Sequence, residues 1–244
     1  MKIAVIGGTG RIGSKIVEIL VKEGHEALPH ARSTGVDLVT REGLSAALKG
    51  ADVFIDATQS PTADDASADF FRRATGNLLT AAEAAGVQHA VLLSIVGVDQ
   101  VPDLAYYRAK VLQEELFKAG AVPCSIVRAS QFFEYIDEIM SWTAQGDNVR
   151  LPPTLLQPIA LADAARAVTD IATGAPLHGV RDVAGPDTLA LDELGKITLT
   201  ARRDARTIVT DPDAGPFAAA SGKALLASDG AHIAPTHYLD WLTA

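Results

Sequence analysis

The sequence is short of cysteine, of clustered histidine and of long apolar runs, and each shortage excludes a class of protein. A single cysteine, Cys124, allows no internal disulfide and suits a reducing compartment. The six histidines are scattered, and His232 and His237 have a proline between them, so no metal site is expected. No segment approaches the roughly 18 consecutive apolar residues of a membrane span. The first residues, MKIAVIGG, lack the apolar region of a signal peptide, so we expect a cytoplasmic location without membrane contact.

Basic residues are outnumbered as well, with 21 Lys and Arg against 30 Asp and Glu. The net charge of −9 repels phosphate groups, so no nucleic-acid partner is expected. Apolar residues are plentiful by contrast: they make up 48% of the 244 residues, which supports a sizeable folded core.

The first half of the chain alternates short apolar runs with helical patterns. The strand-like runs are KIAVIG (2–7), HEALPHAR (25–32), GVDLV (35–39), ADVFIDAT (51–58), HAVLLSIVG (89–97) and PCSIVRAS (123–130). The helical patterns between them are SKIVEILVKEG (14–24), EGLSAALKG (42–50), FFRRATGNLLTAAEAAG (70–86) and AYYRAKVLQEELFKAG (105–120). This order favours parallel pairing through right-handed crossovers. It predicts an α/β fold with a Rossmann-type doubly wound, mostly parallel sheet.

The pattern changes near residue 131, where joins rich in proline and glycine separate the elements. Helices are expected around 132–144, 162–173 and 191–203, and short strands near 180–184 and 207–210. Ligands of open α/β sheets bind beyond the carboxyl ends of the strands, where such additions form a second wall. We interpret 1–244 as a single domain, in which a dinucleotide-binding core (1–130) shares its interior with a small substrate-side lobe (131–244).

A glycine-rich turn, GGTGRIG (7–13), joins the first strand to the first helix. Gly8, Gly10 and Gly13 fit the pattern G-x-G-x-x-G, and counting from Gly7 gives G-x-x-G-x-x-G. Glycines at these positions let backbone N–H groups and the positive end of a helix approach a pyrophosphate. The position of the turn therefore predicts a dinucleotide site, the alternative being a tight structural turn without a ligand.

The end of the second strand, LPHARST (28–34), indicates which dinucleotide. It lacks the acidic residue that would hydrogen-bond the ribose 2′-hydroxyl of NAD. Arg32 stands where a guanidinium can bind a 2′-phosphate, and Arg11 in the turn can assist. We therefore expect NADP, with NAD as the alternative cofactor if Arg32 is a solvated surface charge.

In YYRAK (106–110), Tyr106 precedes Lys110 by four residues, which places both on one helical face. An ammonium beside a phenol makes the phenol a better proton donor at neutral pH. The pair suits the reduction of a carbonyl, in which a proton must reach oxygen as hydride reaches carbon. Two alternatives stay open: Tyr106 lines a pocket while Lys110 binds only ribose, or the two residues have purely structural roles.

Together with DATQ (56–59), LLSIVG (92–97), SIVRASQFFEY (125–135), QPIALADAARA (157–167) and YLDWL (238–242), these motifs resemble the short-chain dehydrogenase/reductase superfamily. The closer resemblance is to its atypical, NmrA-like NAD(P)H-binding branch. It implies that Gly7, Gly10 and Gly13 cradle the pyrophosphate. It also implies that Ser94 orients substrate beside Tyr106 and Lys110. The full cofactor set that we expect is Gly7, Thr9, Gly10, Arg11, Ile12, Gly13, Arg32, Asp37, Leu38 (the last two near adenine), Ala57, Thr58 (both at ribose), Gln59 and Lys110.

The segment SQFFEYIDEIMSW (130–142) is rich in aromatic residues, and the resemblance places its start near the nicotinamide. Gln131, Phe132 and Phe133 are the expected substrate residues, and a small apolar or aromatic substrate is expected. Alternatively, the helical spacing of these side chains fits core packing. The function expected is an NAD(P)-dependent oxidoreductase acting on a small apolar carbonyl or quinone. The alternatives are a non-catalytic NADP(H) redox sensor, or a redox-neutral isomerase or tailoring enzyme that retains its nicotinamide.

Overall fold

The computed structural model describes residues 1–244, and its first half follows the expected alternation of strands and helices. The glycine turn joins strand β1 (Lys2–Ile6) to helix α1 (Arg11–Lys22). Gly86 ends the longest helix in the left-handed region, with φ of 72°. The elements that follow α1 are β2 (Glu26–His30), α2 (Leu44–Leu48), β3 (Val53–Asp56), α3 (Ala66–Ala85), β4 (His89–Ile95), α4 (Ala105–Ala119) and β5 (Cys124–Ala129).

A seven-stranded sheet forms the centre of the fold, in the order β12-β9-β5-β4-β3-β1-β2. Strand β1 pairs in parallel with both β2 and β3, and β3 pairs in parallel with β4. Strands that follow one another in the chain are thus joined by helical crossovers. The predicted fold class, a doubly wound and mostly parallel α/β sheet, is confirmed.

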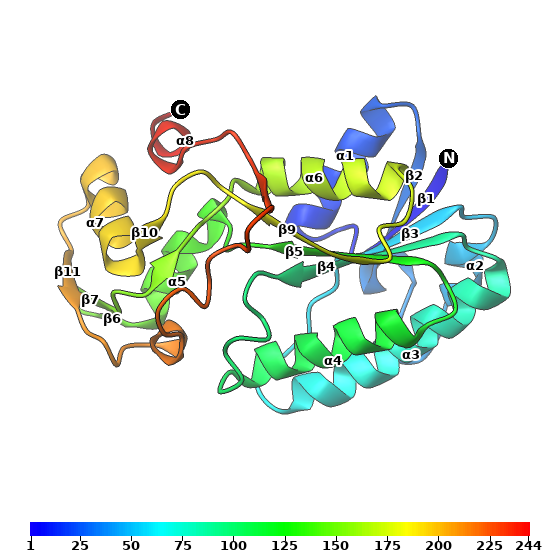
Figure 1. The fold of residues 1–244 in the computed structure, drawn as a ribbon, viewed down its shortest axis with the longest axis horizontal. Coiled ribbons are helices and arrows are strands. Elements are labelled where there is room, and N and C mark those ends of the chain that lie inside the picture. Colours follow the sequence, from blue (N-terminus) through cyan, green and yellow to red (C-terminus); the bar gives the residue numbers. More distant parts are fainter. The chain divides into compact units, whose positions relative to one another are not determined.

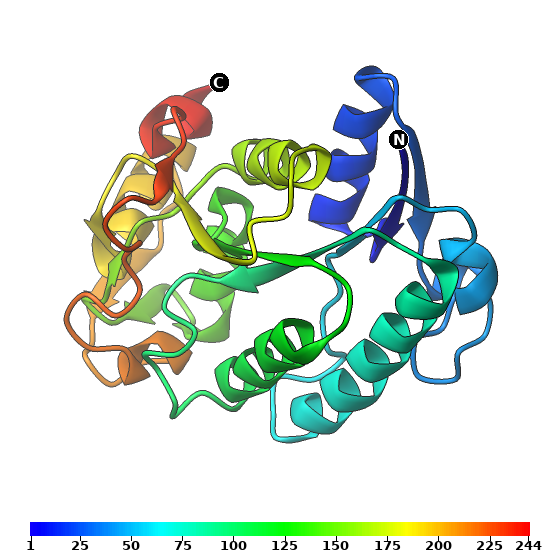
Figure 2. The ribbon, with the colours of Figure 1, turned by 45° about the vertical axis from the view of Figure 1, so that its right-hand side comes forward.

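Helices cover both faces of the sheet, which is why its inner strands β1 and β3 consist mainly of apolar residues. Every residue of β3 is buried, and Ile3 to Ile6 of β1 are at most 2% exposed. In Figures 1 and 2, α3 and α4 lie side by side on one face of the sheet, while α1 and α6 (Leu161–Thr173) lie on the other. Phe54 of β3 packs against Phe117 of α4 with ring centroids 5.8 Å apart.

The prediction of a strand at GVDLV (35–39) is wrong. The carboxylate of Asp37 accepts hydrogen bonds from the backbone N–H groups of Val39 (2.7 Å) and Thr40 (3.0 Å). This local turn uses the backbone donors that a strand would offer to its neighbour. Val36 and Leu38 are nevertheless buried, so the apolar pattern correctly indicated burial.

The second half contains the expected helices and strands together with short elements that were not predicted. Helices α5 (Ile136–Trp142), α6 and α7 (Leu191–Arg202) and strands β9 (Gly179–Ala184) and β11 (Thr207–Thr210) agree with prediction. Two-residue strands have no periodicity from which they could be recognised. The elements that were missed are η1 (Arg32–Thr34), η2 (Phe133–Tyr135), β6 (Ala144–Gln145), β7 (Asn148–Leu151), β8 (Leu155–Leu156), β10 (Leu189–Ala190), η3 (Pro216–Ala219), β12 (His232–Ile233) and α8 (Tyr238–Thr243).

Two compact units divide the chain, which passes between them more than once. The first unit comprises Met1–Ser94, Ala105–Arg128 and Ala164–Arg181. The second unit comprises Ile95–Leu104, Ala129–Asp163 and Asp182–Ala244. The single-domain interpretation with a boundary near residue 130 stays a prediction, and the units interleave on either side of it. No helix has the length and apolar character that crossing a bilayer requires.

Candidate functional site

The glycine turn of the first unit is closed so tightly that side chains cannot be added to it. A Cβ on Gly13 would lie 2.2 Å from the carbonyl oxygen of Gly7, and one on Gly8 would lie 2.6 Å from Cα of Pro29. Gly7 has φ of 77°, in the left-handed region. Helix α1 begins after Gly10 without a side-chain cap, so its first N–H groups are available to an anion.

Residues predicted to surround the ribose and phosphates gather around this turn. Gly7 lies against the segment after β3, since a Cβ on it would be 2.7 Å from the Ala57 carbonyl oxygen. The hydroxyls of Thr9 and Ser33 are 3.4 Å apart, which brings the turn beside η1, where Arg32 is exposed. Arg11 and Gln59 are also exposed, whereas Ile12 is buried. The first unit therefore brings the β1, β2 and β3 ends together at one place.

Asp37 and Leu38, predicted near the adenine, hold the loop after η1. Backbone hydrogen bonds, from Thr40 above all, keep the pKa of Asp37 below its usual value, and the charge of Arg32 acts in the same direction. Leu38 is 8% exposed, and its carbonyl accepts a hydrogen bond of 2.8 Å from Asn77 Nδ2. These contacts shape the loop beside the turn, and the adenine contact itself stays a prediction.

Tyr106 and Lys110 lie on one face of α4, and both contact the ring of Phe71. The ring centroids of Tyr106 and Phe71 are 6.1 Å apart, and Nζ of Lys110 lies 5.2 Å from the Phe71 centroid. Tyr106 is half-buried, whereas the adjacent Tyr107 is only 7% exposed. The four-residue spacing therefore places the phenol of Tyr106, and not that of Tyr107, beside the ring that Lys110 contacts.

A buried polar network surrounds Lys110. Its Nζ donates to the Leu93 carbonyl (2.8 Å) and to Oε1 of Gln113 (2.5 Å). Nε2 of Gln113 donates to Oδ2 of Asp56 (3.0 Å), and Oδ1 of Asp56 accepts from the hydroxyl of Thr58 (2.7 Å). Burial lowers the pKa of Lys110 to about 8, although the charges of Asp56 and Glu114 oppose the change. Burial likewise raises the pKa of Asp56 against these hydrogen bonds.

Sequence analysis missed Asp56 and Gln113 as parts of this network. Asp56 ends the apolar run VFID, and a carboxylate inside such a run needs partners. Gln113 follows Lys110 by three residues, so the two share a helical face. The sequence therefore showed that Asp56 needs a hydrogen-bond partner and that Gln113 lies beside Lys110. It did not show that Asp56 and Gln113 bond to each other, because they meet only when α4 packs on β3.

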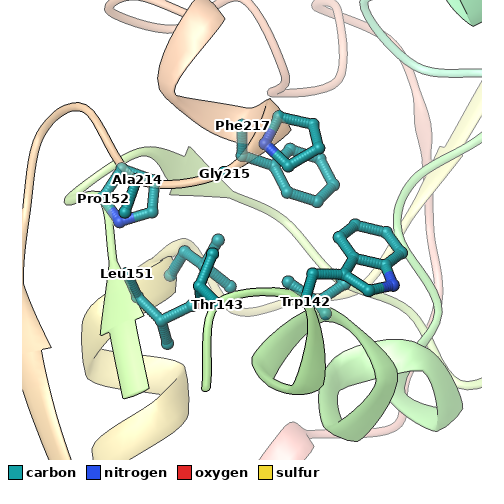
Figure 3. A pocket seen from close by; sticks show the side chains of 10 residues that line it. Trp142, Thr143, Leu151, Pro152, Ala214, Gly215 and Phe217 are labelled. Carbon is teal, nitrogen blue, oxygen red and sulfur yellow. The ribbon is translucent and has the colours of Figure 1, made fainter. Parts of the chain in front are cut away.

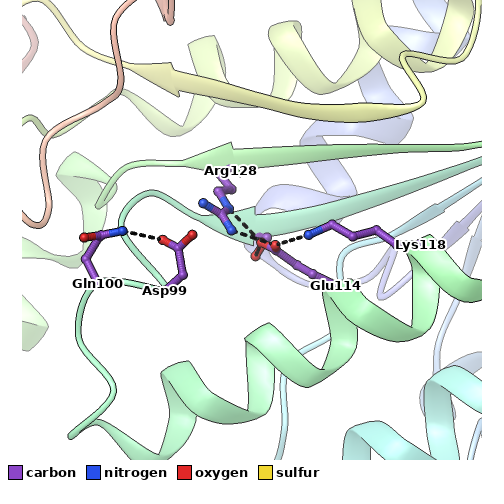
Figure 4. Close-up of polar contacts among 6 residues, drawn as sticks. Asp99, Gln100, Glu114, Lys118 and Arg128 are labelled. Carbon is purple, nitrogen blue, oxygen red and sulfur yellow. Dashed lines mark hydrogen bonds and ion pairs between the residues drawn. The ribbon is translucent and has the colours of Figure 1, made fainter.

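Ser94, predicted to orient the substrate, donates its hydroxyl proton to Glu114 instead of facing an open site. The Oγ of Ser94 and Oε1 of Glu114 are 2.6 Å apart, and Ser94 is 3% exposed. Arg128 donates to both oxygens of Glu114 at 2.8 Å, as Figure 4 shows together with the ion pair to Lys118. Burial alone would raise the pKa of Glu114, but the hydrogen bonds from Arg128 and Ser94 outweigh it and lower that pKa.

Replacing Arg128 with methionine is expected to destabilise the protein by about 3–5 kcal/mol, because the buried carboxylate of Glu114 would lose both hydrogen bonds from the guanidinium. Urea unfolding at neutral pH measures the change. Because the pKa of Glu114 is lowered in the folded state, the stability that it contributes is lost as pH falls below its ordinary value of 4.5. The difference in free energy of unfolding between Arg128→Met and wild type should therefore become smaller in acid. Arg72→Met is the control, because its pair with Asp69 is exposed. Equal losses from both substitutions would contradict this account.

The expected substrate residues lie in the second unit and differ in their surroundings. Phe133 is 1% exposed, and its ring packs 4.9 Å from Tyr238 and 5.4 Å from Trp241, as the core alternative predicted. Phe132 is half-buried and stacks on Tyr135 at 5.7 Å. Both polar atoms of the Gln131 side chain are buried without a partner, which is costly unless a ligand or water satisfies them. Of the three, Gln131 retains the strongest argument for contact with a ligand.

A small apolar pocket, partly open to solvent, also lies within the second unit. Figure 3 shows Trp142 and Phe217 on one side of it and Leu151 and Pro152 on another. The rings of Trp142 and Phe217 stack with centroids 6.3 Å apart, although Trp142 is 52% exposed. The aromatic segment that sequence analysis singled out thus divides between the core, at Phe133, and this pocket, at Trp142.

Comparison with known proteins shows the family. Residues 7–173, which include the glycine turn and the whole of α4, match the sequence profile of a family described as NAD(P)H-binding. The chain belongs to this NAD(P)H-binding family, and the resemblance identified from the motifs is confirmed. The prediction that the cofactor is a nicotinamide dinucleotide is confirmed, without distinction between NAD and NADP.

The curated relatives have different printed names. The chain is 30% identical over 154 residues to a (4-alkanoyl-5-oxo-2,5-dihydrofuran-3-yl)methyl phosphate reductase of Streptomyces griseus, covering 57% of this chain and 50% of the relative. It is 28% identical over 149 residues to the photosystem II assembly factor Ycf39 of Cyanophora paradoxa, covering 55% and 46%. The chain spans about half the length of the curated relatives it matches.

Solved structures share the fold over the whole chain. A nucleoside-diphosphate-sugar epimerase of Staphylococcus aureus superposes with a TM-score of 0.75 at 16% identity, covering 100% of both chains. An NADPH-dependent quinone oxidoreductase of Escherichia coli superposes with a TM-score of 0.71 at 16% identity, covering 99% of this chain and 98% of the other. At these identities the likeness shows the fold alone.

Proposed function

We propose that this protein is an NADP(H)-dependent oxidoreductase that transfers hydride between the cofactor and a small apolar carbonyl or quinone. The observation that carries the proposal is the placement of Tyr106 and Lys110 on one face of α4, both against Phe71. The names of one reductase relative and of the quinone oxidoreductase with the same fold are consistent with it. A panel of quinones and aldehydes, assayed for NADPH oxidation, tests it directly.

The residues of the first unit fit a dinucleotide. The turn at Gly7 and Gly13 leaves no room for a Cβ, and the uncapped start of α1 suits a pyrophosphate. Thr9, Gly10 and Arg11 would surround that pyrophosphate, and Ala57 and Thr58 would flank a ribose. Bound NADPH would supply the hydride.

Side chains of the protein would supply the proton that the reduction requires. The phenol of Tyr106 would donate a proton to the substrate oxygen, and the neighbouring ammonium of Lys110 would stabilise the phenolate that remains. Lys110 uses two of its three N–H donors on Leu93 and Gln113, so one remains for a ribose hydroxyl or for Tyr106. Ser94 would contribute to the site indirectly, through its hydrogen bond to Glu114.

The choice of NADP over NAD is proposed to depend on Arg32. It is exposed on η1, beside the turn, where a guanidinium can pair with a 2′-phosphate. Arg32→Ala is expected to weaken NADPH binding by roughly tenfold to a hundredfold, because a hydrogen-bonded charge pair is lost, and to leave NADH binding unchanged. Isothermal titration with both cofactors measures this, with Arg72→Ala on α3 as the control. Equal affinity of the wild type for both cofactors would refute the assignment.

A second candidate is a non-catalytic sensor that binds NADP(H) and regulates a partner protein. The burial of Lys110, which is 3% exposed and largely engaged by protein acceptors, favours it, as does a relative named as an assembly factor. The same substrate panel separates the two functions. Silence with every substrate, together with tight binding that differs between NADPH and NADP⁺, would support the sensor.

A further inference from the structure

Gln113 is completely buried, with 0% exposure, and lies between two buried ionisable groups. Its Oε1 is 2.5 Å from the Nζ of Lys110, and its Nε2 is 3.0 Å from Oδ2 of Asp56. No direct hydrogen bond joins the lysine to the aspartate. The side-chain amide of Gln113 therefore connects Asp56 to the ammonium of Lys110 through one hydrogen bond at each end.

The polarity of the amide suits this position. Lys110 can only donate and an ionised Asp56 can only accept, so the residue between them must accept at one end and donate at the other. A primary amide does both, whereas a carboxylate cannot donate and an alkyl chain can do neither. Asp56 is itself fixed by Thr58, whose N–H (3.0 Å) and hydroxyl (2.7 Å) both donate to Oδ1.

We propose that Gln113 is a positioning residue that holds the Lys110 ammonium at the site and connects it, through Asp56, to the segment at Thr58. The inference rests on the proposed function, in which Lys110 assists Tyr106 and Thr58 flanks the ribose. Neither Gln113 nor Asp56 would touch substrate. Their effect would be to fix the direction of the remaining N–H of Lys110 and the proton affinity of its amine.

The groups that face Lys110 come from four elements. They are Asp56 of β3, the Phe71 ring of α3, the Leu93 carbonyl of β4, and Gln113 and Glu114 of α4. The two carboxylates favour the ammonium, and burial disfavours it. Removing the carbonyl of Gln113 should therefore lower the pKa of Lys110 below its value of about 8.

The test exchanges the positions of carboxylate and amide. Gln113→Leu keeps the size of the side chain but removes both hydrogen bonds. The double variant Asp56→Asn/Gln113→Glu restores them: Asn at 56 accepts from Thr58 and donates to Glu at 113, which accepts from Lys110. Net charge and the number of hydrogen bonds are conserved. Gln88→Leu is the control, since Gln88 is an exposed glutamine whose side-chain amide donates to the Gly86 carbonyl.

The first measurement is the pKa of Lys110 in the NADPH complex, followed by NMR of lysines labelled at Cε and assigned by loss of the signal in Lys110→Arg. The pKa is expected to fall in Gln113→Leu and to rise above the wild-type value in the double variant, where a carboxylate contacts the ammonium directly. Gln88→Leu should leave it unchanged. The same pKa in all four proteins would overturn the proposal.

The second measurement is kcat/KM against pH. Gln113→Leu is expected to lose roughly tenfold to a hundredfold, the scale of a misplaced reacting group, with its alkaline limb moved to lower pH. The double variant should recover activity, with the limb moved to higher pH. Recovery without movement of the limb would mean that Gln113 only packs, and would overturn the proposal. If Gln113→Leu does not fold, the double variant and Gln113→Glu still provide the pKa comparison.

Failure of the proposed function gives a different result. If the wild-type protein binds NADPH but reduces no substrate, kcat/KM cannot be measured for any variant. The shifts of the Lys110 pKa would still appear if Gln113 positions the lysine. Turnover with no pKa shifts would instead retain the function and refute the role of Gln113.

Discussion

Tyr106→Phe is expected to lower turnover by about 10²- to 10⁴-fold, the usual contribution of a positioned general acid. The affinity for NADPH should stay close to that of the wild type, because the phenylalanine ring can keep the contact with Phe71 that the tyrosine ring makes at 6.1 Å. Stopped-flow measurement of hydride transfer, together with NADPH titration, separates the two effects.

Tyr107→Phe is the matched control, because the two tyrosines are adjacent on α4 but Tyr107 is 7% exposed and lies in the core. It should keep its turnover. Equal activity of the Tyr106→Phe enzyme and the wild type would remove Tyr106 from the chemistry and leave it as a wall of the site. Loss of turnover in both variants would indicate a disturbed helix and not a missing proton donor.

Gly13→Ala is expected to abolish measurable binding of both NADPH and NADH. The new Cβ would lie 2.2 Å from the Gly7 carbonyl oxygen, a distance at which α1 must move away from the turn. That movement displaces the N–H groups that would receive the pyrophosphate, and the overpacking should also cost about 1–3 kcal/mol of stability. Calorimetric titration and thermal unfolding measure both consequences.

Gly76→Ala provides the comparison for Gly13→Ala. Gly76 lies within α3, and a Cβ on it meets nothing within 4 Å. Alanine there should stabilise the helix by about 0.5–1 kcal/mol and leave cofactor binding unchanged. If Gly13→Ala bound NADPH with wild-type affinity, the turn would not be the pyrophosphate site.

Sequence periodicity predicted the large elements well because their causes are local. β1 and β3 are continuous apolar runs, as strands covered on both faces must be. α3 ends at Gly86 because glycine adopts the left-handed conformation at little cost. The glycine turn was recognisable for a related reason, since its close approach excludes a Cβ at Gly13.

The sequence alone did not decide the outcome where a side chain had two alternatives that suited its local sequence equally well. GVDLV has the composition of a strand, but Asp37 binds the next backbone N–H groups and forms a turn. Ser94 occupies the expected position at the end of β4, but its hydroxyl is directed to Glu114, from a different element. Phe133 fits either a substrate wall or a core, and the contact with Tyr238, 105 residues later in the sequence, places it in the core.

The order of strands and helices, the glycine turn and the Tyr106–Lys110 spacing follow from neighbours a few residues apart, so they can be read directly from the chain. The link from Lys110 through Gln113 to Asp56 cannot, because Gln113 and Asp56 are 57 residues apart and meet only when α4 packs on β3. Because this contact is buried, the ammonium of Lys110 and the carboxylate of Asp56 cannot be hydrated by water and must form their hydrogen bonds within the protein.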